Sequence, residues 1–184
     1  MSGVTRSGLG MVARDRQRLS FRAVNRSDSP DFDPGLQRHH LLPRQLLSRN
    51  CFAAMFDALG RDTVDFDDFR RNGLLLPAND QTVLKIGLPL HRGPHRAYNS
   101  MVIERVGQIE ACWTETRPRA PDAAVEVAYH RLELLQRALR RRLLDQHRRL
   151  RLNRHDPLGS GLDFSELDAM AGLLWPATQL PEND

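Results

Sequence analysis

The stretch Arg38–Pro43, RHHLLP, places two histidines side by side ahead of a short apolar run. Adjacent side chains on an extended segment point to opposite sides, so His39 and His40 cannot easily bind the same ion. An imidazole binds transition metals, and with an ordinary pKa near ~6.5 it also accepts a proton at neutral pH. The stretch therefore predicts that one histidine of the pair is a metal ligand and the other is a free base.

Length and composition indicate one domain with one buried core, because the chain has 184 residues and is 40% hydrophobic. Lys85 is the single lysine among 27 basic residues, so nearly every basic group is a guanidinium suited to phosphate. This favours a polyanionic partner, although a biased genomic base composition produces the same excess of arginine. Cys51 and Cys112 are too few for a disulfide framework or a four-cysteine zinc site, and free thiols suit a reducing cytosol.

No segment predicts membrane insertion, since no run approaches the ~20 apolar residues of a spanning helix. Residues 1–20 lack the continuous apolar segment of a signal peptide. We therefore expect a soluble protein with no membrane partner, either cytoplasmic or exported by a route without a cleavable signal peptide.

Hydrophobic spacing predicts a mostly helical α+β fold. Residues 44–59 have the periodicity of an amphipathic helix, and 73–77 (GLLLP) have the character of a strand. A second helix is expected to begin at about Pro94, which suits the first helical position. An arginine-rich helix is expected over residues 122–150, and a short acidic helix within residues 156–184.

Two further histidines, His91 and His95, are separated by three residues. The periodicity of the helix expected from Pro94 puts His95 on its inward face. A catalytic divalent ion commonly takes about three protein ligands and leaves a position for water or substrate. Four clustered imidazoles therefore predict a three-histidine metal site with one base beside it.

An asparagine is expected to orient the base by accepting a hydrogen bond from its other ring nitrogen. Asn72 directly precedes the predicted strand and is preferred for this role. Asn79 is the competing candidate, and for either residue the alternative is ordinary turn chemistry.

Three stretches, RHHLLP, NGLLLP and HRGPHRAYN, occur in this order and together resemble the AHH branch of the HNH/endonuclease VII nuclease superfamily over roughly residues 37–107. The resemblance implies a small ββα-metal (His-Me finger) core with additional helices and hydrolysis of phosphodiesters with a single metal, commonly in DNA. Carried over residue by residue, it implies His39, His91 and His95 as metal ligands, His40 as general base and Asn72 as the central asparagine. The chain departs from the family pattern at Arg38, where the family has alanine.

The same resemblance includes many bacterial toxin and effector modules, for which an immunity protein is a partner. Whether this chain is a toxin, a phage enzyme or a housekeeping nuclease stays open, as does its oligomeric state. The predicted division is an N-terminal arm of loose order (1–36), a nuclease core (37–115), and an arginine-rich helix with an acidic C-terminal helix packed on the core (116–184).

Four residues are candidates for contact with the substrate. Arg92 and Arg96 flank the second histidine pair and could hold phosphate, Arg38 adds positive charge beside the site, and Tyr98 lies within reach of it. For the arginines the alternative is a solvated charge, and for Tyr98 it is core packing. The arginine-rich helix could track a phosphate backbone or pack against the acidic C-terminal segment.

The predicted function is that of a metal-dependent endonuclease that cuts DNA with low sequence specificity, with one divalent ion (Mg, Mn, Ni or Zn) and a histidine base. One alternative is a nucleic-acid- or protein-binding module in which the histidines form a structural metal clip. The other is a ribonuclease that uses the same site.

Overall fold

The structure is a computed structural model that describes residues 18–60, 64–148 and 150–159. Five α-helices, two 3₁₀ helices and one two-stranded sheet make up this described part. In chain order they are η1 (Phe21–Ala23), β1 (Leu36–His40), η2 (Arg44–Ser48), α1 (Asn50–Leu59), α2 (Phe69–Asn72), β2 (Gly73–Pro77), α3 (Asp80–Ile86), α4 (Arg96–Thr116) and α5 (Pro121–Leu144).

The sheet is an antiparallel pair in which the RHH stretch of β1 lies against the GLLLP strand, β2. His39 pairs with Leu74 and His40 pairs with Gly73. Beyond His40, the amide of Leu41 donates to the carbonyl of Asn72 at 2.8 Å, which extends the ladder by one bond. The predicted strand at 73–77 is confirmed.

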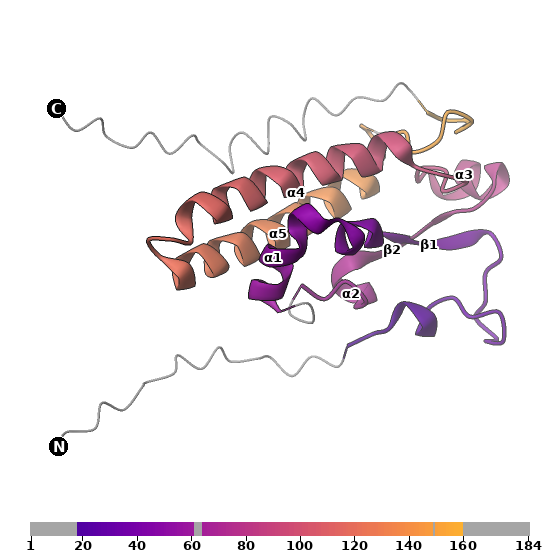
Figure 1. Cartoon of the computed structure of the whole chain (residues 1–184). Helices are drawn as coiled ribbons and strands as arrows, with labels where there is room; N and C mark the ends of the chain where they lie inside the picture. The colour runs from indigo at the N-terminus through magenta and orange to yellow at the C-terminus, as the bar shows by residue number, and fades with distance from the viewer. Residues whose placement is uncertain (1–17, 61–63, 149, 160–184) are drawn as a thin grey trace, which may run out of the picture.

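The long helices α4 and α5 lie side by side, α1 packs against both, and the sheet lies towards the end where α4 begins (Figure 1). The apolar stripes expected from the sequence form their contact. Side chains buried along these stripes are Val102, Val106, Ile109, Trp113, Leu132, Leu135, Leu139 and Leu143. Burial of these stripes supplies the main hydrophobic stabilisation and fixes where α4 begins relative to the sheet.

The helix predicted over residues 44–59 is divided into η2 and α1. Arg49 interrupts it with extended backbone angles, φ −90° and ψ 117°. The hydroxyl of Ser48 donates to the carbonyl of Gln45, the acceptor that a continuous α-helix would have offered to the amide of residue 49. The predicted end of the helix is confirmed, since Gly60 follows α1 with φ +78°.

Within the arm expected over residues 1–36, residues 18–36 make contacts with the rest of the described structure. Phe21 is buried, and Ser20 forms a bridge with Asp68. The side chain of Asn25 donates to the carbonyls of Asp33 and Leu36, so it fastens the loop that leads into β1. The apolar residue that anchors this segment stands alone among polar ones, which is why helical or strand periodicity did not reveal it.

The predicted acidic helix within residues 156–184 lies outside the described residues from residue 160 onward, and so does its expected packing on α5. None of the helices among the described residues is long and apolar enough to cross a membrane.

Candidate metal centre and active site

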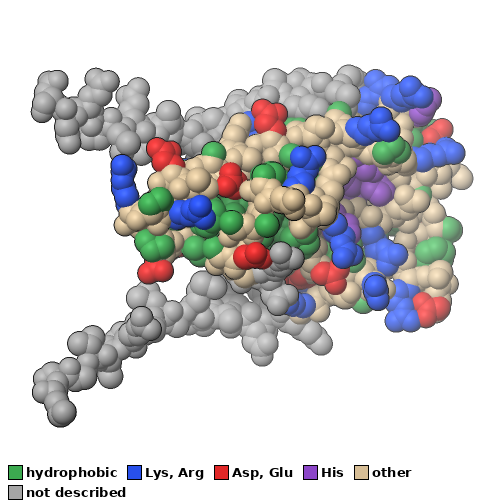
Figure 2. All heavy atoms as spheres, viewed as in Figure 1, with side chains coloured by type: hydrophobic (Ala, Val, Ile, Leu, Met, Phe, Trp, Pro, Cys, Tyr) green, Lys and Arg blue, Asp and Glu red, His purple; other side chains and the backbone are tan. Residues whose placement is uncertain are grey.

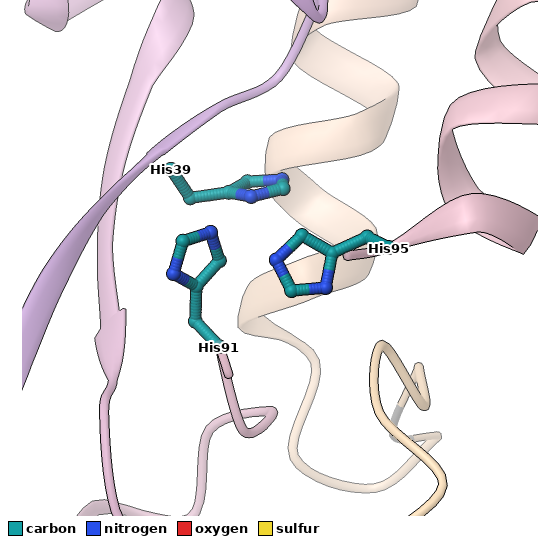
Figure 3. A group of neighbouring side chains, drawn as sticks. All are labelled: His39, His91 and His95. Atoms are coloured by element: carbon teal, nitrogen blue, oxygen red, sulfur yellow. The ribbon is translucent and has the colours of Figure 1, made fainter. Parts of the chain in front are cut away.

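Three imidazoles from separate parts of the chain converge at the start of α4. His39 comes from β1, His91 from the loop after α3, and His95 is the residue that precedes α4 (Figure 3). One ring nitrogen from each lies within 4.8 Å of those of the other two. The ring centroids are 4.9 Å apart for His39 and His91, and 4.4 Å apart for His91 and His95.

Local backbone bonds explain this convergence. The amide of His91 donates to the carbonyl of Pro77 at 2.7 Å, which places His91 at the end of β2. The preceding amide, of Leu90, donates to a carboxylate oxygen of Asp156 at 2.9 Å. Gly93 then turns the chain with φ +76°, a conformation that costs least for glycine, and brings His95 back beside His91.

Two of the three clustered rings have a ring nitrogen without a hydrogen-bond partner in the part of the chain that the structure describes. Nε2 of His39 and Nδ1 of His95 are buried and have no hydrogen-bond partner among the described residues. Two of the rings also have supporting contacts, since Nδ1 of His91 lies 3.2 Å from Oε1 of Gln37, and a backbone hydrogen bond with Leu152 acts on His95. Such outer bonds fix the orientation of a ligating ring.

The same environment keeps the imidazoles neutral. Burial holds the pKa of His39 well below 6.5, and the neighbouring His91 and His95 lower it further. Burial also lowers the pKa of His91, to about 4, and that of His95. Neutral imidazoles are the form that binds a metal. The three histidines, which lie together within the described part of the chain, therefore fit a divalent transition-metal ion.

His40 is on the opposite side of β1 from His39 and is half-buried. Its ring stacks on Phe21, and its Nε2 is buried without a hydrogen-bond partner in the described part of the chain. Burial lowers the pKa of His40 to about 4, and the positive charge of Arg44 acts in the same direction. His40 is therefore an unprotonated imidazole at neutral pH.

Asn72 is completely buried, but it does not orient the ring of His40 as expected. Its Oδ1 accepts from the amide of Leu42 at 2.7 Å, and its Nδ2 donates to the carbonyls of Leu42 and Phe66, each at 3.1 Å. Its side chain thereby ties the loop after His40 to the segment before α2. The competitor, Asn79, is exposed and accepts from the amide of Thr82 at the start of α3.

Two of the four expected substrate contacts are occupied by the protein itself. Tyr98 is fully buried, and its hydroxyl donates to the carbonyl of Leu41 at 2.8 Å, so its role is structural. Burial also raises the pKa of Tyr98 far above its usual range. Arg38 is exposed and lines the histidine cleft, and its Nη1 donates to the carbonyl of Phe21 at 2.8 Å.

The histidines open onto a cleft of about 410 Å³. Arg92 and Arg96 are exposed but do not line it, whereas Arg38 and Arg44 do. Figure 2 shows His side chains at the surface with Lys and Arg side chains around them. Residues that line this cleft and were not singled out from the sequence are Pro43, Arg44, Gln45, Gly93 and Asn99.

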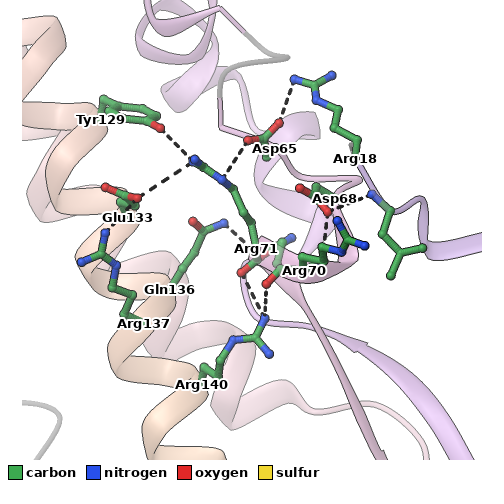
Figure 4. A network of polar contacts seen from close by, with 12 residues as sticks. Arg18, Asp65, Asp68, Arg70, Arg71, Tyr129, Glu133, Gln136, Arg137 and Arg140 are labelled. Atoms are coloured by element: carbon green, nitrogen blue, oxygen red, sulfur yellow. Dashed lines mark hydrogen bonds and ion pairs between the residues drawn. The ribbon is translucent and has the colours of Figure 1, made fainter. Parts of the chain in front are cut away.

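Much of the arginine surplus around α5 is bound to the protein (Figure 4). Arg71, from α2, donates to the hydroxyl of Tyr129 and pairs with Asp65. Arg137 pairs with Glu133 at 2.9 Å, and Arg140 donates to the carbonyl of Arg70 at 2.8 Å. The contacts of Arg71 and Arg140 join α5 to the segment before β2, a use that the sequence did not indicate.

Comparison with known proteins agrees with this site. A family model described as a nuclease family of the HNH/ENDO VII superfamily with conserved AHH matches residues 20–139. The match covers more than half of the chain, and the chain belongs to this nuclease family. It begins before β1 and extends through most of α5, well beyond the residues 37–107 indicated by the sequence motifs. No curated protein and no solved structure matches the chain significantly.

Proposed function

We propose that this nuclease is a metal-dependent endonuclease that hydrolyses phosphodiester bonds in DNA with low sequence specificity. His39, His91 and His95 would hold one divalent ion, and His40 would be the general base. The observation that carries the proposal is the convergence of three imidazoles, two of them with a buried nitrogen that no described residue bonds, and a fourth neutral imidazole on the same cleft. Buried polar atoms without partners are rare in folded proteins, and a bound ion would satisfy them.

The accessible nitrogen of His40 defines its part in the reaction. Its Nε2 is buried and His40 lines the cleft, so in this proposal Nδ1 is the nitrogen that takes the proton from a water molecule there. An unprotonated imidazole at this position removes a proton from the attacking water, which is the task of a general base. A divalent ion bound by the three other histidines would stabilise the negative charge that develops on the phosphate.

Arg44 supplies positive charge on the same cleft. Its guanidinium is exposed and is close enough to affect the pKa of His40. A planar guanidinium binds phosphate through two parallel hydrogen bonds and keeps its charge at all relevant pH values. In this proposal Arg44 is added to the phosphate-binding residues on the cleft, which Arg38 also lines, while Arg92 and Arg96 extend the basic surface beside it.

The test is a cleavage assay on plasmid DNA with Mg²⁺, Mn²⁺, Ni²⁺ or Zn²⁺ and with chelator. We expect the wild type to nick the plasmid only when an ion is present, and His40→Ala to lower the rate about 10²- to 10⁴-fold. His147→Ala, which removes an exposed histidine, is the matched control and should cut like the wild type.

Two results would redirect the proposal. Nicking that survives His40→Ala, or wild-type protein that binds an ion without cutting, would indicate a structural metal clip. Faster cleavage of labelled single-stranded RNA than of duplex DNA would instead make the protein a ribonuclease with the same site.

A further inference from the structure

The ring of Phe21 lies flat against the ring of His40. Their centroids are 3.7 Å apart and their planes differ by 2°. Phe21 is 6% exposed, so its ring is held in place by surrounding protein. A face-to-face contact at this distance restrains both the position and the plane of an imidazole.

Hydrogen bonds do not provide this restraint for His40. A functional histidine is usually oriented by a bond from its second ring nitrogen to a carbonyl or carboxylate. Nε2 of His40 has no such partner among the described residues, and the side chain of Asn72 is engaged with Leu42 and Phe66. Among the described residues, the contact that restrains the plane of this imidazole is therefore the stacked ring of Phe21.

Phe21 itself is fastened from two sides. The carbonyl of Phe21 accepts a hydrogen bond from Nη1 of Arg38, which also lies 3.3 Å from the carbonyl of Val24. The ring of Phe69 packs edge-on against Phe21, with centroids 5.1 Å apart. The amide of Phe69 donates to the carbonyl of Leu19 at 2.7 Å, so backbone and side chain join the same two segments.

A glycine opposite His40 makes room for this arrangement. Gly73 is the cross-strand partner of His40 in the sheet. A Cβ atom at Gly73 would lie 2.2 Å from the ring of Phe69, a distance that no real contact allows. The place of a cross-strand side chain is thus taken by Phe69, which in turn supports Phe21.

We propose that Phe21 is a positioning residue that holds the imidazole of His40 in the orientation needed for proton transfer, and that Arg38 anchors it. The role rests on the proposed function of His40 as a general base. It also gives a reason for arginine at position 38, since this side chain reaches the backbone of the stacked residue from the position before the two histidines.

The test compares Phe21→Leu with Phe21→Tyr in the full-length protein. Leu keeps an apolar side chain without a flat ring, whereas Tyr keeps the ring. Small errors in the placement of a catalytic group reduce rates about 10- to 100-fold, so we expect Phe21→Leu to lower kcat by about that factor with KM unchanged. Phe21→Tyr should keep kcat within a few-fold of the wild-type value. Metal affinity should be the same in the wild type, Phe21→Leu and Phe21→Tyr.

A structural readout is independent of cleavage. Proton NMR of the imidazole of His40 should show the upfield ring-current shift of a stacked neighbour in the wild type and in Phe21→Tyr. Phe21→Leu should lose that shift. Arg38→Gln provides a second variant. Because the side chain of Arg38 is exposed, this substitution leaves the core intact, and the variant should have a lower kcat with little change in KM.

The outcomes separate the two proposals. Wild-type protein that cleaves no nucleic acid, or that cleaves equally well without His40, overturns the proposed function and this role with it. An active wild type whose kcat is unchanged by Phe21→Leu, despite loss of the ring-current shift, overturns the role of Phe21 alone. If Phe21→Leu does not fold, as judged by its thermal melt, Arg38→Gln decides: unchanged kcat or an unchanged ring-current shift overturns the proposal, and lowered kcat together with a reduced shift supports it.

Discussion

The histidine cluster at the start of α4 and the arginine network between α2 and α5 are both dense in polar groups, but they differ in how those groups are satisfied. In the histidine cluster, nitrogens of His39 and His95 are buried and unbonded within the described structure. In the arginine network, defined as Arg71, Tyr129, Glu133, Arg137 and Arg140, the charged groups bind one another or backbone carbonyls. We infer that the first cluster is arranged for a ligand and the second for the fold.

This difference shows why charge density alone is a poor guide to function. The sequence has a surplus of arginine along α5, which suggested a track for phosphate. Two of those guanidiniums, of Arg137 and Arg140, are engaged with Glu133 or with the carbonyls of α2. The basic groups available to a substrate are instead those near the cleft, such as Arg44.

The largest expected effect on stability concerns Asn72, a residue that is fully bonded and lies between the two regions. Asn72→Ala would leave the amide of Leu42 and the carbonyls of Leu42 and Phe66 buried without partners. We expect the free energy of unfolding, measured in urea, to fall by about 3 kcal/mol or more. The matched control is Asn79→Ala, which removes an exposed helix cap and should cost about 1 kcal/mol. Equal losses of unfolding free energy in the two variants would show that the buried hydrogen bonds of Asn72 contribute no more than an exposed helix cap.

A second expected effect is acid sensitivity of the metal-free protein. The folded state lowers the pKa of His39, His40, His91 and His95, with His40 and His91 at about 4, against an ordinary value of 6.5. Between these values the unfolded chain binds more protons than the folded one, so stability is full above pH 6.5 and falls as the pH decreases towards about 4. Chemical denaturation in chelator at stepped pH checks this. The slope of the free energy of unfolding against pH should be smaller in His39→Leu than in the wild type. An equal slope in the two proteins would contradict the account.

The smallest expected effect tests the arginine network with two neighbouring residues. Arg140 donates to the carbonyls of Arg70 and Arg71, whereas Arg141 is exposed. Arg140→Gln should lower the free energy of unfolding by about 1 kcal/mol, and Arg141→Gln should change it by less than about 0.5 kcal/mol. Thermal melts of both variants provide the comparison. Any loss of DNA affinity should be larger in Arg141→Gln than in Arg140→Gln. A larger loss in Arg140→Gln would show that the network binds the substrate.

The sequence predicted the parts of the molecule that depend on short-range patterns. The GLLLP strand, the apolar stripes of α4 and α5 and the end of α1 at Gly60 follow from local periodicity and are confirmed. The family resemblance is confirmed as well, although the match extends further in both directions. The helix expected from Pro94 begins two residues later, at Arg96, so His95 precedes the helix and is not part of its face.

The parts that the sequence did not predict depend on contacts between distant residues. The stack of Phe21 on His40, the tie from Asn72 to the loop after His40, and the bond from Arg38 to Phe21 each join segments that no local pattern relates. Single side chains such as Phe21 and Tyr98 carry no periodic signal of their partners. Their roles become visible only when the backbone brings the partners together.

The central claim is that His39 and His40, although adjacent in the chain, belong to different parts of one site: His39 holds a metal and His40 does not. Titration of the chelated protein with Zn²⁺ or Ni²⁺ in a calorimeter, for the wild type, His39→Ala and His40→Ala, tests it most directly. We expect one ion per chain for the wild type and His40→Ala with similar affinity, and an affinity weaker by about a hundredfold or more for His39→Ala, since even outer partners of ligands are worth 10- to 100-fold. Equal loss of binding in both variants, or no binding by the wild type, would contradict the account.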